Sequence, residues 1–174
     1  MILETDRLYL REMKQSDFNS LCNFLQDFQV MYAYEHAFSN DEVQSWLDNQ
    51  IRRYKEYGFG LWAIIKKDTG EFIGDCGLTY QDFNGKNVLE IGYHLQKKFW
   101  HKGFATEVAI ACKEYAFNKL NADEVFSIIR DNNIPSQRVA IRNGMTICGE
   151  FTKHYYNMDM PHLVFSIKNN NIKK

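Results

Sequence analysis

The order of apolar and polar positions in the first third of the chain predicts a strand followed by two helices. Residues 7–13 alternate between apolar and polar side chains, which is typical of a half-buried strand. Apolar residues spaced three or four apart follow Ser16, so we expect a helix that Ser16 caps. Ser39 and Glu42 have the spacing of a capping box, which opens a second helix that ends at Gly58.

The middle of the chain predicts three antiparallel strands. Two apolar runs, 61–65 and 71–78, flank the turn-forming residues 68–70, and this pattern favours a hairpin. The Asn-Gly pair at 84–85 marks the next turn and leads into a strand at residues 89–95.

The rest of the pattern predicts two more helices and three more strands. A short basic loop, 96–102, comes before a helix that opens at Gly103, and a strand at 124–129 follows. Pro135 fits the first turn of a short helix that ends at residues 143–144. The last two expected strands are residues 148–151 and 163–167.

These elements predict a mixed α/β fold. A helix between strands 89–95 and 124–129 makes a right-handed crossover, so these two strands should be parallel in an otherwise antiparallel sheet. Ligands favour the strand ends at such a point of a sheet. The chain has 174 residues and no visible repeat or linker, so we expect one domain at 1–168 and a polar, frayed tail at 169–174.

Composition narrows the possible classes of function. The 45% hydrophobic content indicates a globular protein, and the net charge of −1 argues against a nucleic-acid binder. Four widely spaced cysteines, Cys22, Cys76, Cys112 and Cys148, favour reduced and mostly buried thiols over a disulfide framework or zinc site. The charged start and the lack of a long apolar run predict a cytoplasmic protein without a membrane segment.

The strand-to-helix junction before Gly103 indicates an anion site. A helix N-terminus offers unpaired N–H groups and the positive end of its dipole, and Gly103 lets a ligand approach the backbone closely. His101 and Lys102 add donors or charge, so we expect this loop to hold a pyrophosphate; the alternative is an ordinary turn. The chain lacks both the G-x-x-x-x-G-K-[ST] and the G-x-G-x-x-G motif, which argues against a P-loop ATPase and a dinucleotide fold.

Across nearly its whole length the chain resembles the GNAT superfamily of N-acetyltransferases, in particular the group that acetylates the N-termini of ribosomal proteins. The matching pieces occur in the expected order and are E-T-D-R-L-Y-L-R at 4–11, G-E-F-I-G at 70–74, L-E-I-G-Y-H-L at 89–95, W-H-K-G-F-A-T-E at 100–107, N-I-P-S-Q-R-V-A at 133–140 and N-G-M at 143–145. The resemblance implies a mostly antiparallel central sheet with one splayed parallel strand pair, flanked by helices.

The resemblance also implies the reaction and the residues that bind the acetyl carrier. Acetyl-CoA would be the co-substrate, its pantetheine arm would lie along residues 89–95 like an added strand, and a primary amine would attack the thioester directly in a ternary complex. Ser136 would lie close enough to the sulfur to protonate it. The implied cofactor-binding residues are Tyr93, Leu95, Trp100, His101, Lys102, Gly103, Phe104, Ala105, Thr106, Asn133 and Ser136.

The chain departs from the family pattern at four positions. Trp100 replaces the usual Gln or Arg of the phosphate loop, and His101 stands where many relatives carry glycine. Ala140 stands where many relatives carry a tyrosine that serves as acid for the leaving thiol, so that role must fall to another group or to water. Met145 replaces the usual phenylalanine, which changes packing only.

Strand 89–95 carries the candidate acid–base groups. Glu90, Gly92 and His94 share one face of the strand because side chains alternate with a period of two. Glu90 is a candidate catalytic residue that would accept the ammonium proton through water or bind the cationic substrate; the alternative is a carboxylate satisfied by a neighbour. His94 would be a base or a merely hydrogen-bonded histidine, and Gly92 a bulge or a packing glycine.

The amine acceptor site has weaker signals. Acceptor specificity is expected in segments 26–40 and 152–162. Aromatic residues that would line the acceptor pocket or belong to the core are Phe28, Tyr32, Tyr34, Trp62, Tyr155 and Tyr156. The spacing of His36, His154 and His162 does not match metal ligands, so no metal is expected. The expected partner is a small-molecule or peptide amine, with no nucleic acid or membrane, and the expected assembly is a monomer or homodimer.

Two other classes of function are compatible with the sequence. The absence of a tyrosine at position 140 keeps open a non-catalytic acyl-CoA-binding sensor or structural relative, which would bind acetyl-CoA without turnover. A nucleotide-binding protein could use the same helix N-terminus, although the missing phosphate-loop lysine argues against it. Turnover with any amine distinguishes the enzyme from both.

Overall fold

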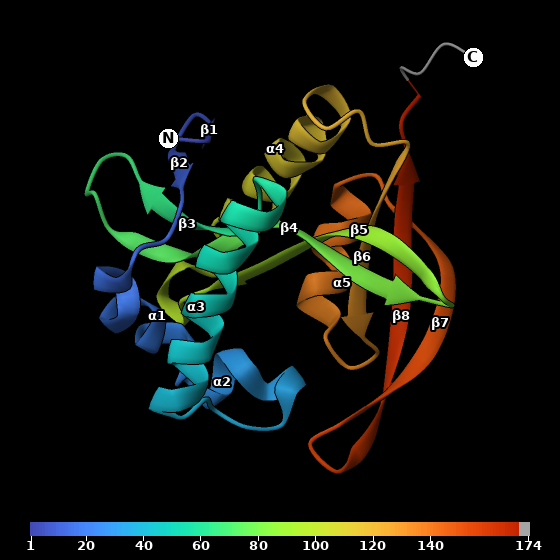
Figure 1. Cartoon of the computed structure of the whole chain (residues 1–174), viewed down its shortest axis with the longest axis horizontal. Coiled ribbons are helices and arrows are strands. Elements are labelled where there is room, and N and C mark those ends of the chain that lie inside the picture. The colour runs from blue at the N-terminus through green and yellow to red at the C-terminus, as the bar shows by residue number, and fades with distance from the viewer. Residues whose placement is uncertain (171–174) are drawn as a thin grey trace.

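The computed structural model describes residues 1–170 and has the mixed α/β fold expected from the sequence (Figure 1). Its elements are β1 (Leu3–Glu4), β2 (Leu8–Arg11), η1 (Gln15–Asp17), α1 (Phe18–Leu25), α2 (Phe28–Met31), η2 (Tyr32–Tyr34), α3 (Asn40–Tyr57), β3 (Leu61–Lys66), β4 (Phe72–Phe83), β5 (Lys86–Leu95), η3 (Lys97–Phe99), α4 (Phe104–Asn118), β6 (Glu124–Arg130), α5 (Ile134–Arg142), β7 (Thr146–Tyr155) and β8 (Met158–Lys168), where η marks a short 3₁₀ helix.

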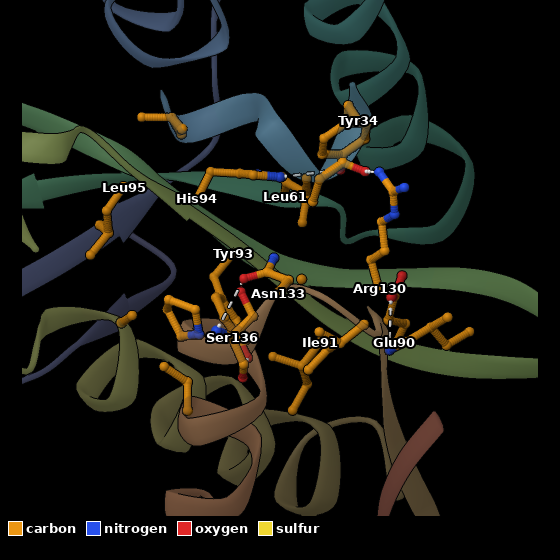
Figure 2. A pocket seen from close by; sticks show the side chains of 18 of the residues that line it. Tyr34, Leu61, Glu90, Ile91, Tyr93, His94, Leu95, Arg130, Asn133 and Ser136 are labelled. Carbon is orange, nitrogen blue, oxygen red and sulfur yellow. Dashed lines mark hydrogen bonds between the residues drawn. The ribbon is translucent and has the colours of Figure 1, made fainter. Parts of the chain in front are cut away.

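One sheet with the strand order β1-β2-β3-β4-β5-β6-β8-β7 runs through the molecule. Neighbouring strands are antiparallel except β5 and β6, which are parallel, as the crossover predicts. Helices α1 and α3 lie over one face of the sheet, and α4 and α5 lie side by side over the other (Figures 1 and 2). The parallel pair therefore lies in the middle of the sheet with helices on both sides.

The predicted capping box of α3 was correct, and the predicted Ser16 cap was wrong. Ser39 and Glu42 exchange side-chain-to-backbone hydrogen bonds at the start of α3, and Gly58 ends that helix with φ 77°. Asn133 caps α5. Ser16 does not cap the first helix, because the Asp17 carboxylate accepts the Lys14 N–H and closes the η1 turn that leads into α1.

The last two strands are longer than predicted and form a hairpin. β7 and β8 pair from Thr146↔Ser166 to Tyr155↔Met158, far beyond the apolar runs at 148–151 and 163–167. Their tip turns at Tyr156 and Asn157, which both have a positive φ although neither is glycine. β7 is an edge strand whose side chains are mostly exposed, so the apolar runs marked only part of it.

The end of the chain was predicted to fray from residue 169. Asn169 is anchored, since its N–H donates to the Asp123 carbonyl at 2.8 Å. Residues 171–174 of the predicted tail lie outside the described residues.

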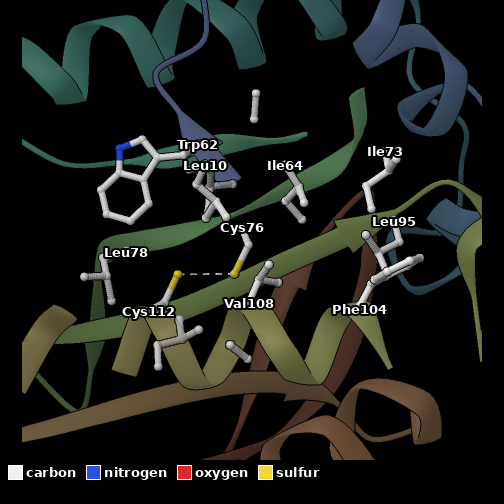
Figure 3. Packing of buried hydrophobic residues seen from close by; sticks show 14 of the residues in the cluster. Leu10, Trp62, Ile64, Ile73, Cys76, Leu78, Leu95, Phe104, Val108 and Cys112 are labelled. Carbon is white, nitrogen blue, oxygen red and sulfur yellow. Dashed lines mark hydrogen bonds between the residues drawn. The ribbon is translucent and has the colours of Figure 1, made fainter. Parts of the chain in front are cut away.

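The main core lies between the sheet and the helices on either side (Figure 3). Trp62, one of the aromatic candidates for the acceptor pocket, is fully buried here and contacts Tyr115 edge-on. Cys76 and Cys112 are also buried, with their sulfurs 3.5 Å apart as free thiols. Cys148 is exposed, so it departs from the expected burial of the cysteines.

Candidate active site

A cleft of about 960 Å³ opens where β5 and β6 separate. Its walls include Trp46 of α3 from one face of the sheet and Phe104 of α4 from the other. The cleft therefore passes through the sheet between the two parallel strands (Figure 2).

Where β5 and β6 separate, hydrogen bonds from side chains replace the missing backbone hydrogen bonds between them. β5 and β6 pair only at Glu90↔Phe126. Beyond that point the Glu90 carboxylate accepts the Ile128 N–H at 3.2 Å, and the Ser127 hydroxyl donates to the Ile91 carbonyl at 2.9 Å. Gly92 forms no bulge against β4, since the β4–β5 register continues through it without a shift. Gly92 therefore lies at a regular position of the β4–β5 pairing, and the expected bulge is absent there.

The first turn of α4 offers unoccupied backbone donors to the cleft. Gly103 is the N-cap residue with φ 80°, and no side chain caps the helix. The N–H groups of Phe104, Ala105 and Thr106, all cleft residues, therefore lack helix partners. His101 adopts φ 59°, a left-handed conformation that glycine adopts more readily than other residues.

Most of the predicted cofactor residues line the cleft together. These are Tyr93, Leu95, Trp100, His101, Gly103, Phe104, Ala105, Thr106, Asn133 and Ser136. Lys102 does not line it: its ammonium lies 5.4 Å from the centre of the Phe99 ring, and its carbonyl accepts from Arg7. The Trp100 indole donates to the Leu95 carbonyl at 2.9 Å, so Trp100 joins the loop to the end of β5.

Asn133 and Ser136 have separate roles at the start of α5. The Asn133 side-chain oxygen accepts the Ser136 N–H at 3.3 Å and the Tyr32 hydroxyl at 2.9 Å. The Tyr93 phenol donates to the Ser136 carbonyl at 2.7 Å. Within residues 1–170 the Ser136 hydroxyl has no hydrogen-bond partner, so it is available to a ligand.

The other side of the cleft carries Glu90 and His94, which share a face of β5 as predicted. Burial raises the pKa of Glu90 above 4.5, while the Ile128 N–H and the charge of Lys153 oppose that rise. Thr79 donates to the second carboxylate oxygen at 3.3 Å. His94 lies between the Asp75 carboxylate, at 2.8 Å, and the Tyr34 hydroxyl, at 3.2 Å.

The two predicted acceptor segments meet at this side of the cleft. Tyr32, Tyr34 and Tyr155 line it, whereas Phe28 and Tyr156 are exposed and do not. Several lining residues were missed by sequence reasoning because only the folded chain brings them to the cleft; they are Phe38, Trp46, Arg53, Arg138 and Arg142. The last two are spaced four apart on α5, a signal that could have shown that they share a helix face.

The remaining histidines have other partners. His36 pairs with Glu42, His154 with Asp159, and His162 with the Met160 carbonyl. Among the described residues no group of three or more His, Cys, Asp or Glu side chains could hold a metal ion. No helix within residues 1–170 is long and apolar enough to cross a membrane.

Comparison with known proteins identifies the family. Residues 7–146 match the model of the acetyltransferase (GNAT) domain. YkkB of Bacillus subtilis (strain 168) is 34% identical over 170 residues, which cover 97% of this chain and 96% of YkkB.

Solved structures show the same fold. A GNAT-family acetyltransferase from Bacillus anthracis superposes with a TM-score of 0.81 at 22% identity, covering 97% of this chain and 98% of that one. The ribosomal L7/L12 α-N-protein acetyltransferase RimL, in complex with coenzyme A, has a TM-score of 0.76 at 16% identity, covering 96% and 97% of the two chains. With its matching domain model and splayed parallel strands, the chain belongs to the GNAT family and is an acetyltransferase.

Proposed function

We propose that the protein transfers the acetyl group of acetyl-CoA to a primary amine by direct attack in a ternary complex in the cytoplasm. The amine is a peptide or protein N-terminus or a small molecule. The observation that carries this proposal is the cleft that passes through the sheet. An acetyl carrier and an amine can enter the cleft from opposite faces of the sheet and meet where β5 and β6 separate.

The uncapped first turn of α4 fits a pyrophosphate. Backbone N–H groups at a helix N-terminus bind anions, and those of Phe104, Ala105 and Thr106 are not used by a cap. Arg138 and Arg142 line the same cleft and form no ion pair within residues 1–170, so their charges would meet the carrier's phosphates. The coenzyme A complex of RimL, which shares the fold, supports coenzyme A as the carrier.

The free edge of β5 fits the pantetheine arm. β6 pairs with β5 only at Glu90, so the edge of β5 from Gly92 to Leu95 has no strand partner on that side, although the Trp100 indole already takes the Leu95 carbonyl. An extended arm would add to this edge as a strand does, with Tyr93 and Leu95 beside it. The bound carrier supplies an activated thioester carbonyl.

Carboxylates on the other side would attract a cationic amine. Glu90 lines the cleft together with three further acidic residues, Asp41, Glu42 and Asp82. Both oxygens of Glu90 already accept protein hydrogen bonds, so we assign it to holding the ammonium group by charge. Segments 26–40 and 152–162 would set the choice of amine.

The leaving thiolate would meet the Ser136 hydroxyl. Ala140 is buried and carries no acid, whereas Ser136 lines the cleft with an unused hydroxyl at the start of α5. The N–H dipoles of this helix end favour developing negative charge, and Ser136 would donate a hydrogen bond or relay a proton from water.

The test is turnover with acetyl-CoA and a mixed panel of amines and N-terminal peptides. Acetylated products should be measured by mass spectrometry, because the exposed Cys148 thiol would itself react with a thiol reagent. An acetylated amine is the expected result. Binding of acetyl-CoA without any acetylated amine would overturn the proposal and favour a non-catalytic carrier-binding protein.

A further inference from the structure

Three side chains from distant parts of the chain form a continuous hydrogen-bonded row from the core to the cleft. Asp75 of β4 is fully buried, and its Oδ1 lies 2.8 Å from His94 Nδ1. The opposite ring nitrogen, Nε2, lies 3.2 Å from the Tyr34 hydroxyl. Tyr34 lines the cleft, and Figure 2 shows His94 extended toward it from β5.

The partners of Asp75 favour one tautomer of His94. The indole N–H of Trp46 can only donate, and it donates to the other Asp75 oxygen at 3.1 Å. We assign Oδ1 as an acceptor as well, with the proton of this contact on His94 Nδ1. The Nε2 lone pair then faces Tyr34 and accepts its O–H.

The phenol of Tyr34 is held in a position to pass a proton. Burial raises its pKa, and the nearby carboxylates of Glu90 and Asp75 raise it further, so the group remains a phenol. Arg130 holds the segment around Tyr34, because it donates to the Ala33 carbonyl at 3.0 Å and pairs with the Glu35 carboxylate. Within the cleft, the remaining lone pairs of the Tyr34 oxygen can accept from a ligand.

We propose that Tyr34, His94 and Asp75 form a proton relay that deprotonates the acceptor amine, an inference that rests on the proposed function. The ammonium passes one proton to the Tyr34 oxygen while the phenol proton passes to His94 Nε2, and the amine keeps the electron pair that attacks the thioester. The imidazolium formed is paired with the Asp75 carboxylate, so no uncompensated charge is buried. Tyr34 is the catalytic residue, and His94 and Asp75 are positioning residues.

The surroundings of His94 suit this role. The charged or titratable groups that face it are Asp75 of β4, Glu90 on its own strand and Tyr34 of η2. The other contacts are the rings of Phe24 from α1 and Trp46 from α3. The row from Asp75 through His94 to Tyr34 is therefore enclosed by aromatic rings on the helix side of the sheet.

The first test is the pH dependence of kcat for an amine that the wild type acetylates. Tyr34→Phe keeps the ring and removes only the hydroxyl, so we expect a folded protein with kcat reduced ~10²-fold or more near neutral pH. The loss should shrink as the pH approaches the pKa of the amine, because solvent then supplies the free base. Tyr80→Phe, a half-exposed tyrosine outside the cleft, is the matched control. A wild-type kcat for Tyr34→Phe, or an equal loss at every pH, would overturn the relay.

The second test measures which ring nitrogen of His94 carries the proton, and it does not depend on turnover. In nitrogen-15 NMR of the full chain we expect His94 to carry its proton on Nδ1 in the wild type, and we expect Asp75→Asn to shift it to Nε2. A proton on Nε2 in the wild type would overturn the relay. An inactive wild type that keeps the Nδ1 proton would instead overturn the proposed function, so the two failures are distinguishable.

Discussion

At the scale of single residues, two side chains at the start of α5 have different roles: Asn133 caps the helix, and Ser136 is the candidate for the chemistry. The family resemblance assigns Ser136 to the leaving thiol. In the folded chain the cap is Asn133, and the Ser136 hydroxyl is unused. Asn133 therefore supplies the cap of α5, and we propose that Ser136 acts on the thiolate.

Ser136→Ala tests that proposal. We expect kcat to fall at least ~10-fold, because a lost acid contact typically costs ~10²–10⁴-fold and Ser136 is a weak acid assisted by water. The KM for acetyl-CoA and the melting temperature should hardly change. Asn133→Ala is the contrasting variant and should lower stability by ~1 kcal/mol through the lost cap. Normal turnover of Ser136→Ala would remove it from the mechanism.

Glu90→Gln tests attraction of the cationic amine. In the wild type the KM for an alkyl amine should rise as the pH falls through the raised pKa of Glu90, because the carboxyl loses its charge while the amine stays protonated. The variant should have a KM ~10-fold higher near neutral pH and nearly constant over this range. The amide oxygen of the variant can still accept the Ile128 N–H, so the link between β5 and β6 is retained. A parallel pH dependence of KM in both proteins would show that Glu90 is structural.

At the scale of elements, the sequence correctly predicted the helices and strands whose ends are marked by capping or turn residues next to them in the chain. The Ser39–Glu42 box and Gly58 delimit α3, and the Asn84–Gly85 turn joins β4 to β5. The β7–β8 turn was missed because Tyr156 and Asn157 adopt positive φ without a glycine. The first helix lies where it was predicted, but its cap was misassigned because Asp17, and not Ser16, accepts the backbone N–H that closes the turn before it.

Asp17 also carries a charge that links this turn to β2. Arg11 donates two hydrogen bonds to its carboxylate, at 2.7 and 2.8 Å. Burial raises the pKa of Asp17, but the bonds from Arg11 and Lys14 outweigh it and bring the pKa below 3.8. An acid with a lowered folded-state pKa stabilises the fold above its unfolded pKa and loses that contribution as the pH falls through the folded pKa.

Asp17→Asn should therefore lower the free energy of unfolding near neutral pH by ~1–3 kcal/mol, the usual range for hydrogen bonds to a charged group. The difference from the wild type should begin to narrow as the pH falls below the ordinary Asp pKa, where the unfolded chain takes up a proton, and it should be lost only below the lowered pKa of folded Asp17. Urea unfolding at a series of pH values measures this. A difference that is the same at pH 3 and pH 7 would mean that packing, and not charge, is responsible.

At the scale of the whole molecule, the site depends on contacts that no local pattern contains. The glycine of the phosphate loop and the strand with Glu90 and His94 were visible in the sequence. Tyr34, Asp75 and Trp46 reach His94 from three separate elements, and Arg130 holds the Tyr34 segment from a fourth. Lys102 looked like a phosphate ligand by sequence, but the left-handed turn at His101 and Gly103 directs it to Phe99. Side-chain direction in such a loop follows from backbone dihedrals and not from spacing.

Acetyl-CoA should stabilise the whole fold by binding only the native state. At a concentration ~100 times Kd the gain in the free energy of unfolding is ~2.7 kcal/mol, which for a domain of this size corresponds to a rise in Tm of ~5–10 °C.

Gly103 has φ 80°, so a branched residue there would strain the backbone itself, whereas asparagine tolerates the left-handed region. An added Cβ at Gly103 would meet only Arg7 Nη2, at 3.5 Å. Gly103→Asn should therefore keep most of the Tm without ligand and lose most of the shift, because an asparagine at the N-cap can itself accept the N–H groups that would bind the pyrophosphate. Gly70→Asn, at φ 68° in the β3–β4 turn with open space around it, is the matched control and should keep the full shift. Equal shifts in both variants, measured by thermal unfolding with and without acetyl-CoA, would place the pyrophosphate away from α4.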